Sequence, residues 1–530
     1  MSYKVVIPTA GIGSRLFSLT KNLNKSLVSL NNKPIICHII EKFPKDCKFV
    51  IPIGYKGKLV KDFLKIAYPK IYFKFVKIKN YSGKYSGLGL TLLKAKKYLQ
   101  EPFLFIPCDT LVKQKINPPV YNWVGYANKT SQDKNFRRCI VNKGNLNMLV
   151  EKSYKKTNNQ FPYTGLCGIK DYKEFWESFN DLNNYDFLRG ESFAIQKMLP
   201  KLKFKAKKYE WFDVGNLKSY EITKSIFKKK KIYNILEKEN EAIWFVNEKV
   251  IKYSNDKGFI KKRYLRTKYL NNYVPKIIDI KDNFYSYNLQ KGIIFSSNPS
   301  QKNLKKLLDY SMNFWNLKKI KKANTKQKLK SKKFYKEKTL KRIKLFYKLK
   351  KSDDNINKIS IINNIPIKSL KYLLNKINWE DLCSGLFGRY HGDYHFENIL
   401  ITKKKSFLFL DWRQDFEGDI SKGDIYYDLA KLMHGMIVSH PQVNLNKFKF
   451  LKKNNNIEIN IFVPESIKKC RAYFYKWLEK NNLEKKRVDL LTSLIFLNIA
   501  PLHHYPYNMF LFNLGKIMLQ KTLNNEEFNF

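Results

Sequence analysis

The sequence predicts two α/β domains: a doubly wound mixed sheet in the N-terminal part of the chain and a bilobal α+β domain in the C-terminal part. Three observations support this. The length of 530 residues exceeds what one hydrophobic core usually serves. Near the N-terminus an apolar strand leads directly into a glycine-rich turn, and further strands alternate with helical segments. Beyond residue 380, a polar loop precedes an apolar strand that ends in a carboxylate.

The boundary between the domains is predicted at a run of lysines, Lys228 to Lys231, because blocks of like charge are usually solvated. The first domain then covers residues 1–230 and the second covers residues 235–530. Within the second domain, strand patterns indicate a small lobe at about 235–292, and helical patterns indicate a large lobe at about 293–530.

The first predicted strand covers residues 3–8 and feeds a turn that contains Gly11, Gly13 and Ser14. A glycine-rich turn that follows a strand presents backbone N–H groups that can cradle a phosphate. The turn has neither the G-x-G-x-x-G pattern of dinucleotide-binding folds nor the G-K-[ST] of a P-loop. The sequence therefore indicates a phosphate-binding turn of a different kind.

Arg15 and Lys25 follow this turn, and the segment Lys33-Pro34-Ile35 comes after them. This set of features resembles the nucleotidyltransferase family that includes sugar-1-phosphate nucleotidyltransferases and phosphocholine cytidylyltransferases. The resemblance implies a Rossmann-like fold in which the glycines and the serine of the turn bind the nucleotide. It also implies catalytic roles for Arg15 and Lys25, which would neutralise charge at the α-phosphate as pyrophosphate leaves. The chain departs from the family at Asn24, where proline is usual.

Two carboxylates complete this resemblance. Asp109 ends the apolar strand at residues 103–109, and ligands of open α/β sheets bind at the carboxyl ends of strands. Helix capping is the alternative role for Asp109. Asp213 stands in a W-F-D-V-G segment that is similar to the family's W-x-D-V-G-T. The resemblance covers about residues 3–228, and it implies that Asp109 and Asp213 hold Mg²⁺ and that Gly87 contacts the base.

The polar loop in the C-terminal part contains Asp393 and Asn398, and the strand that follows ends in Asp411-Trp412. An aspartate, an asparagine five residues later and a second aspartate can accept a proton and hold Mg²⁺ against nucleotide phosphates. A structural polar loop before a core strand is the alternative. The stretch resembles the choline kinase and aminoglycoside phosphotransferase superfamily, whose signature is H-G-D-x-H-x-x-N. That resemblance implies a protein-kinase-like fold, with Asp393 as the catalytic base and Asn398 and Asp411 as metal ligands.

Two further predicted strands, residues 242–246 and 249–253, carry Lys252. The setting of Lys252 resembles the kinase strand whose lysine pairs with the α- and β-phosphates, which makes it a candidate nucleotide-binding residue. The helix predicted at about 261–270 contains no glutamate to orient this lysine. The lysine-dense segment 301–380 has a helical pattern. It is either a solvated face or a surface that grips an anionic partner.

The formal net charge of +58 suggests a polyanionic partner. The excess is almost all lysine and is spread along the whole chain, whereas specific phosphate readers favour arginine. We therefore expect no specific nucleic-acid partner, only weak polyanion binding. No stretch reaches the ~18 apolar residues of a membrane span, the N-terminus has no signal-peptide pattern, and the seven cysteines form no CxxC pair. These features predict a soluble, cytoplasmic protein.

Together, the two resemblances imply a bifunctional, Mg²⁺-dependent enzyme. The C-terminal domain would use ATP to phosphorylate a hydroxyl of a small-molecule acceptor. The N-terminal domain would use CTP or another nucleoside triphosphate to activate the phosphorylated product, for decoration of a surface glycan or lipid. The acceptor is either an amino alcohol such as choline or ethanolamine, or a sugar phosphorylated at its anomeric hydroxyl. Alternatively, one domain is an inactive binding or regulatory module. The sequence does not predict the oligomeric state.

Overall fold

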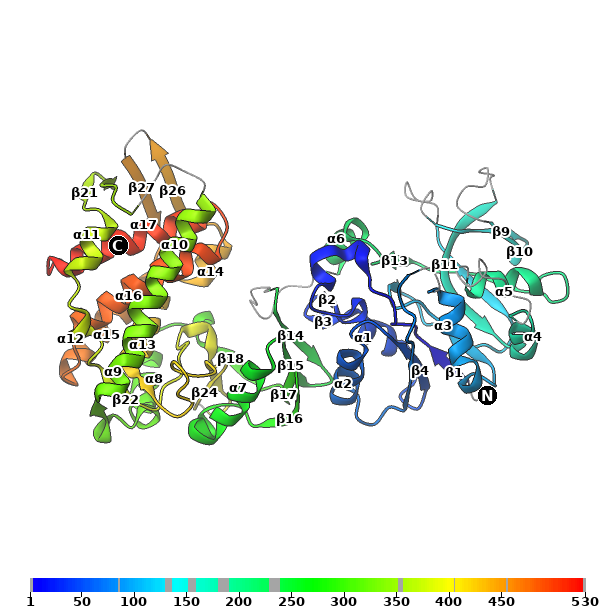
Figure 1. Ribbon diagram of the computed structural model, residues 1–530, viewed down its shortest axis with the longest axis horizontal. Helices are drawn as coiled ribbons and strands as arrows, with labels where there is room; N and C mark the ends of the chain where they lie inside the picture. The colour runs from blue at the N-terminus through cyan, green and yellow to red at the C-terminus, as the bar shows by residue number, and fades with distance from the viewer. Residues whose placement is uncertain are drawn as a thin grey trace. The chain divides into compact units, whose positions relative to one another are not determined.

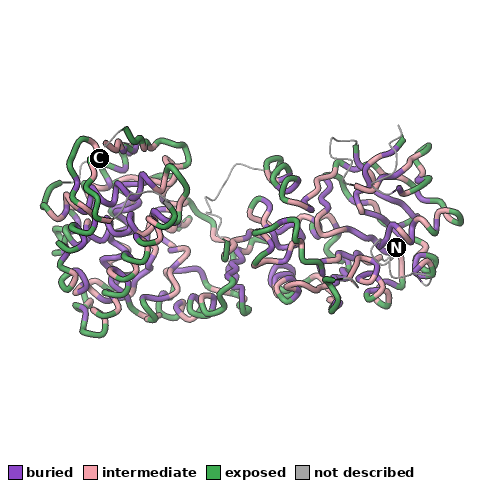
Figure 2. Tube along the Cα trace, turned by 45° about the horizontal axis from the view of Figure 1, so that its top comes forward, coloured by how far each residue is buried: buried purple, intermediate pink, exposed green. Residues whose placement is uncertain are grey.

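The chain forms two compact units in a computed structural model (Figure 1). The first unit comprises Met1–Lys257 and Ile278–Leu289, and the second comprises Gly258–Ile277 and Gln290–Phe530. Each unit has its own buried interior (Figure 2). The structure describes residues 3–83, 86–128, 136–150, 159–179, 190–227, 239–350, 356–404, 406–453 and 456–527.

A nine-stranded mixed sheet lies at the centre of the first unit, in the strand order β5-β4-β1-β6-β11-β8-β12-β10-β9. These strands are β1 (Lys4–Val6), β4 (Lys48–Ile53), β5 (Phe73–Lys77), β6 (Phe103–Phe105), β8 (Trp123–Tyr126), β9 (Arg138–Asn142), β10 (Asn145–Val150), β11 (Gln160–Ile169) and β12 (Lys205–Lys208). The four strands β5, β4, β1 and β6 are parallel to one another. The next strand, β11, is antiparallel to β6. The predicted mixed sheet is therefore confirmed, with the strands predicted at 3–8 and 103–109 as β1 and β6.

Short helices and two small strand pairs surround this sheet. They are η1 (Ser14–Thr20), η2 (Lys25–Leu27), β2 (Ser29–Leu30), β3 (Lys33–Pro34), α1 (Ile35–Ile40), α2 (Gly57–Ala67), α3 (Leu88–Ala95), η3 (Lys96–Tyr98), β7 (Thr110–Val112), α4 (Tyr172–Glu177), α5 (Glu191–Met198), β13 (Trp211–Asp213) and α6 (Leu217–Ile226).

Both faces of the sheet are covered by helices, because successive side chains of a strand point to opposite faces. Val5 and Phe49 belong to one buried core, which also contains residues of α1 and α2. Val6 and Val50, the next residue along each strand, belong to a second core with residues of α3, α4 and α5. This alternation is the physical basis of the doubly wound arrangement.

A four-stranded sheet packs against α2 within the first unit. Its strands are β14 (Glu241–Val246), β15 (Lys249–Ser254), β16 (Ile277–Lys281) and β17 (Phe284–Asn288), in the order β14-β15-β17-β16. The ring of Trp244 lies 5.1 Å from that of Phe63 on α2. Asn247 Nδ2 and Lys249 Nζ donate hydrogen bonds of 2.9 and 3.0 Å to the last carbonyls of α2.

These strands match those predicted for the small lobe of the second domain. They belong to the first compact unit because their apolar face completes the core on α2. The lysine run at which we predicted the domain boundary, Lys228 to Lys231, lies outside the described residues.

We expect Trp244→Ala to lower the free energy of unfolding of the first unit by about 3–5 kcal/mol, since a fully buried tryptophan leaves a large cavity. Urea denaturation measures the loss. Phe245→Ala, one residue along β14 and only partly buried, is the matched control and should cost less. A loss below about 1 kcal/mol for Trp244→Ala would contradict the packing of this sheet on α2.

The second unit is mainly helical, with three small sheets. Its elements are α7 (Lys257–Leu270), η6 (Asn271–Tyr273), β18 (Gly292–Ile294), η7 (Phe295–Ser297), α8 (Gln301–Trp315), η8 (Leu317–Lys319), β19 (Lys321–Lys322), α9 (Thr325–Lys332), η9 (Lys333–Glu337), α10 (Lys338–Lys350), β20 (Ser360–Ile362), β21 (Ile365–Ile367), α11 (Leu370–Lys376), α12 (Trp379–Leu382), β22 (Leu386–Gly388), η10 (Phe396–Asn398), β23 (Ile399–Thr402), β24 (Phe407–Phe409), β25 (Gly423–Asp424), α13 (Ile425–Ile437), α14 (His440–Asn444), β26 (Phe448–Lys453), β27 (Asn456–Ile461), α15 (Glu465–Lys480), α16 (Lys485–Ile499), η11 (Ala500–Leu502) and α17 (Tyr507–Leu523).

Helix α13 forms the centre of the second unit, and all its residues are buried. The pattern of segment 301–380 predicts helices throughout. The structure differs, because residues 360–367 form the hairpin β20–β21. Asn363 and Asn364 adopt positive φ of 49° and 65° at its turn, which asparagine tolerates well. This Asn-Asn pair between two isoleucine-rich runs was the available signal for a hairpin.

Within the described part of the chain, no helix combines the length and apolar character needed to cross a membrane. The seven cysteines form no disulfide bonds.

Candidate active sites

The glycine-rich turn after β1 is held tightly against the segment that carries Lys25. Gly13 has a φ of 72°, and a Cβ added there would lie 3.0 Å from Lys25 Cβ. The carbonyl of Gly13 accepts a 3.1 Å hydrogen bond from Thr20 Oγ1. A Cβ at Gly11 would meet nothing within 4 Å, and Ser14 begins η1 with an exposed side chain. The turn therefore presents an open backbone surface next to Lys25.

Asn24 holds the backbone next to Lys25 in place. Its side chain is fully buried, and Nδ2 donates to the carbonyls of Thr9 (2.9 Å) and Tyr55 (2.7 Å). Its Oδ1 accepts a 3.0 Å hydrogen bond from the N–H of Ser26, which caps η2. Sequence reasoning noted Asn24 only as a departure. The Asn-x-Ser capping pattern was the signal for its role.

Lys25 and Asp109 form a partly buried ion pair, and Arg15 lies close enough to act on both. Burial opposes the charge of Lys25, but Asp109 outweighs it and the pKa of Lys25 is raised. Burial likewise opposes the ionisation of Asp109, but Lys25 and then Arg15 hold the pKa of this carboxyl below its ordinary value. Lys25 and Asp109 are therefore both charged at neutral pH.

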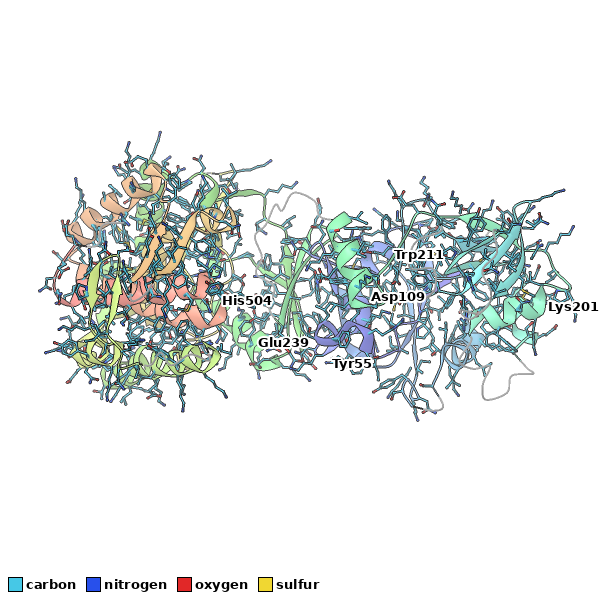
Figure 3. The ribbon with its side chains drawn as sticks, turned by 90° about the horizontal axis from the view of Figure 1, so that it is seen from above. Tyr55, Asp109, Lys201, Trp211, Glu239 and His504 are labelled. Atoms are coloured by element: carbon cyan, nitrogen blue, oxygen red, sulfur yellow. The ribbon has the colours of Figure 1, made fainter. Side chains whose placement is uncertain are left out.

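Asp213 meets Asp109 at Gly215. A Cβ added to Gly215 would lie 2.9 Å from Asp213 Oδ1 and 3.0 Å from Asp109 Oδ2, so only glycine fits between the two carboxylates. The backbone produces this meeting, because β13 pairs with β7 and the Val214 N–H donates to the Asp109 carbonyl. Asp109 immediately precedes β7 and Trp211 begins β13; both side chains are labelled in Figure 3. Burial, and then the charge of Asp109, raises the pKa of Asp213.

The donor set of Asp109 and Asp213 fits Mg²⁺, which prefers carboxylate oxygens and retains positions for phosphate and water. Ser219 Oγ donates a 2.5 Å hydrogen bond to Asp213 Oδ2, and the Gly215 N–H donates to Oδ1 at 3.1 Å. Among the described residues, no three His, Cys, Asp or Glu side chains gather as a metal site. A cation here would therefore depend on the phosphates for its remaining ligands.

Gly87 lies at the N-terminus of α3, as predicted, with its carbonyl accepting hydrogen bonds from the backbone and hydroxyl of Thr91. The side chain of Leu88 packs next to Gly190, which precedes α5. Glu191, the first residue of α5, is buried, and its Oε2 has no hydrogen-bond partner among the described residues. Burial raises the pKa of Glu191 to about 7.

The raised pKa of Glu191 gives a pH-dependent prediction. The folded protein holds this proton more tightly than the unfolded chain, whose glutamates titrate near 4.5, so stability falls as the pH rises from 4.5 to 7. We expect Glu191→Gln, which is neutral at every pH, to be more stable than the wild type by about 2–3 kcal/mol at pH 8 and nearly equal to it at pH 4.5. Urea denaturation at both pH values tests this.

The exposed Glu174→Gln on α4 is the control and should show no such difference. Equal stability of Glu191→Gln and wild type at pH 8 would contradict a strained, buried carboxyl.

In the second unit, Asp393 is the centre of a network of charged and polar groups. Lys431 Nζ from α13 lies 2.9 Å from Asp393 Oδ1, and His395 Nε2 lies 3.4 Å from Oδ2. Asn398 Nδ2 donates to the carbonyl of Asp393 at 2.9 Å and to its Oδ2 at 3.1 Å. Burial opposes the ionisation of Asp393, but Lys431 and then His395 hold its pKa well below the ordinary value.

Lys431 is a residue that sequence reasoning missed, and it lies on the same helix as Asp428. The two residues are three apart on α13 and so share a face of that helix. Asp428 accepts hydrogen bonds of 2.6 Å from the N–H groups of both His391 and Gly392. One helix therefore fixes the loop through Asp428 and contacts the Asp393 carboxylate through Lys431.

Helix α7 provides arginines to this loop. The predicted helix at 261–270 indeed contains no glutamate, and Arg263 Nη1 instead lies 2.6 Å from Asp411 Oδ1. The fully buried Arg266 donates to the carbonyls of Tyr390 (2.6 Å), Ile420 (3.1 Å) and Arg413. Since backbone carbonyls buried without a donor are costly, Arg266 is a structural clamp on the loop. Arginine is scarce in this lysine-rich chain, and that was the signal for these positions.

The structure places Asn398 next to the strand end that carries Asp411. The N–H of Leu410 donates a 2.7 Å hydrogen bond to the Asn398 carbonyl, and β23 pairs with β24 in the same register. Asp411 adopts a φ of 61°, a conformation that turns the chain sharply at the strand end. An amide oxygen and a carboxylate at adjacent positions are hard oxygen donors that fit Mg²⁺.

Lys252 lies on β15 in the first unit, whereas Asp393, Asn398 and Asp411 lie in the second. Its side chain is buried, and Nζ lies 5.9 Å from the centre of the Tyr287 ring.

The sheet of the first unit and the residues gathered at Gly215 define the N-terminal region as nucleotidyltransferase-like. The chain is 29% identical over 219 residues to the bifunctional protein GlmU of Methanocaldococcus jannaschii, a match that spans 40% of this chain and 50% of the relative. The chain thus spans about half the length of the curated relatives it matches. No family model matches it.

Solved structures similar to the chain include a UDP-glucose pyrophosphorylase complexed with UDP-glucose (20% identity, TM-score 0.37, 43% of this chain and 98% of that one). Another is the CTP:phosphocholine cytidylyltransferase of Streptococcus pneumoniae (18% identity, TM-score 0.35, 43% of this chain and 100% of that one). The kinase-like character of the second unit stays a prediction.

Proposed function

We propose that the protein is a bifunctional enzyme with one Mg²⁺-dependent phosphate chemistry in each unit. In each unit, a lysine from a distant position in the sequence pairs with a carboxylate, and a proposed Mg²⁺ ligand lies beside that carboxylate. This observation supports the proposal most directly. In the first unit, Lys25 joins Asp109 and Asp213. In the second unit, Lys431 forms an ion pair with Asp393, and the side chain of Asn398 donates a hydrogen bond to the Asp393 carboxylate.

The first unit transfers a nucleotidyl group. The phosphate of the acceptor attacks the α-phosphorus of a nucleoside triphosphate, and the bond to pyrophosphate breaks. Arg15 and Lys25 balance the negative charge that develops, while the backbone of Gly11, Gly13 and Ser14 holds the nucleotide. Asp109 and Asp213 would hold Mg²⁺, which would supply charge neutralisation for the transfer.

The second unit phosphorylates a hydroxyl of a small molecule. The hydroxyl oxygen attacks the γ-phosphorus of ATP, its proton passes to Asp393, and the bond to the β-phosphate oxygen breaks to release ADP. The lowered pKa keeps Asp393 ionised and able to accept a hydrogen bond from the acceptor. Lys431 adds positive charge beside the γ-phosphoryl group. Asn398 and Asp411 are the proposed Mg²⁺ ligands, and Lys252 is the proposed partner of the α- and β-phosphates.

In the second candidate function, only one unit is an active enzyme and the other is a binding module. The ion pair between Arg263 and Asp411 favours it, because a bound cation must compete with this arginine for the carboxylate.

Incubation with Mg²⁺, ATP, CTP and a panel of hydroxyl compounds, analysed by mass spectrometry, tests the proposal. A bifunctional enzyme gives both a phosphorylated acceptor and its nucleotide adduct. Formation of the adduct only when the phosphorylated compound is added directly would favour the single-activity candidate.

A further inference from the structure

Three basic side chains lie close to the loop that carries Asp393. Arg413 follows Asp411 by two residues, and its N–H donates a 3.0 Å hydrogen bond to the His391 carbonyl. A Cβ added at Gly392 would lie 2.5 Å from Arg413 Cβ, so the stem of Arg413 packs directly on the backbone beside Asp393. Lys338 begins α10, and Arg342 lies four residues further on, on the same face of that helix. Lys338 Nζ and Arg413 Cζ lie over the same ring, that of Phe334.

The faces of two aromatic rings are already covered by these protein cations. Lys338 Nζ lies 4.3 Å from the centre of the Phe334 ring, and Arg413 Cζ lies 4.6 Å from the same centre. Lys338 Nζ also lies 5.7 Å from the centre of the Tyr427 ring. Aromatic faces are what a quaternary or primary ammonium group would bind. At these two rings the position is occupied by the protein itself.

The cations are not balanced by carboxylates. Among the described side chains, none forms a salt bridge with Lys338, Arg342 or Arg413, and the buried Arg413 Nε has no hydrogen-bond partner. Of the nearby carboxylates, Asp393 pairs with Lys431 and Glu397 with His395, and the exposed Glu417 acts on Lys338 without forming an ion pair with it. Burial, and then Arg413, Lys431 and Arg342, lowers the pKa of Lys338 well below its ordinary value, as expected for uncompensated positive charge.

The general lysine excess of the chain does not explain this cluster. Lysine is the default basic residue here and lies mostly on exposed faces, whereas arginine is scarce. Two of the three cluster residues are arginines, and both are partly buried. Arginine presents a planar fork of donors that matches carboxylate and phosphate groups. A bound anion would supply the charge and the acceptors that the cluster lacks.

We propose that the acceptor phosphorylated at Asp393 is an anionic hydroxyl compound, a polyol or sugar that bears a carboxylate or a phosphate, held by Lys338, Arg342 and Arg413. This inference rests on the proposed phosphotransfer by the second unit and narrows its acceptor. It excludes choline, ethanolamine and other cationic amino alcohols, because their charge would be repelled by the cluster.

Matched pairs of small probes test the proposal with the full-length protein, Mg²⁺ and ATP. Gluconate is compared with sorbitol, glycerol 3-phosphate with glycerol, and choline is the cationic probe. We expect at least one anionic probe to bind, by calorimetry, about tenfold or more tightly than its neutral partner and than choline. The two pairs distinguish carboxylate from phosphate recognition. Tighter binding or phosphorylation of choline, or no preference for either anion, overturns the proposal.

Variants assign the effect to the cluster. Lys338→Gln and Arg342→Gln should each raise the Kd of the preferred anion about tenfold and leave the KM for ATP unchanged. Lys341→Gln, an exposed lysine on the same helix, should change neither. A raised KM for ATP would show that the cluster serves the nucleotide and would overturn the proposal. Anion binding without any Asp393-dependent phosphorylation would instead reject the proposed phosphotransfer.

Discussion

Asp393→Asn is expected to lower kcat for phosphorylation of the acceptor by about 100- to 10,000-fold while nucleotidyl transfer continues at the wild-type rate. Asparagine has nearly the same shape as aspartate and can still receive the hydrogen bond from Lys431, but it cannot accept a proton from the hydroxyl. The measurement is ADP formation from ATP with the acceptor identified in the probe panel, together with pyrophosphate release from the other nucleotide in the same preparation.

Asp419→Asn is the matched control, since it removes a carboxylate of the second unit whose ion pair is with Lys330 rather than with the loop. It should retain phosphorylation. Urea denaturation checks that the second unit of Asp393→Asn is folded, because nucleotidyl transfer reports on the first unit alone. A loss of both reactions in a folded Asp393→Asn protein would mean that the units do not work separately.

Asp109→Asn is expected to have the opposite effect, a loss of nucleotidyl transfer of about 100- to 10,000-fold with phosphorylation unchanged. The substitution removes one of the two carboxylates that meet at Gly215 and leaves Lys25 without its counter-charge. Since a buried cation without a partner is costly, the free energy of unfolding should also fall, by a few kcal/mol. Pyrophosphate release measures the activity, and urea denaturation measures the stability.

Asp62→Asn, which breaks a surface ion pair with Lys58 on α2, provides the comparison. It should leave both the activity and the stability nearly unchanged, because surface ion pairs contribute little. Wild-type pyrophosphate release by Asp109→Asn would remove Asp109 from the catalytic site and favour a purely structural role for its pair with Lys25.

Local sequence was sufficient to identify the strand ends and loops at which the chemistry is expected. The turn at Gly13 follows the apolar run of β1 within a few residues, and the carboxylate at Asp109 likewise follows that of β6, so that short local patterns predict a strand and its turn, and a strand and its end. The hairpin of β14 and β15 was predicted in the same way. These features depend on side-chain periodicity and turn chemistry, which short segments carry by themselves.

Only the tertiary structure decided which distant side chains meet. Lys431 reaches Asp393 across 38 positions of sequence, Lys25 reaches Asp109 across 84, and Arg263 reaches Asp411 across 148. It also decided that β14 and β15 complete the core on α2 and that Asn24 replaces a proline by capping η2. The reason is physical: periodicity shows which face of an element is buried, but the partner of that face depends on how the whole chain packs.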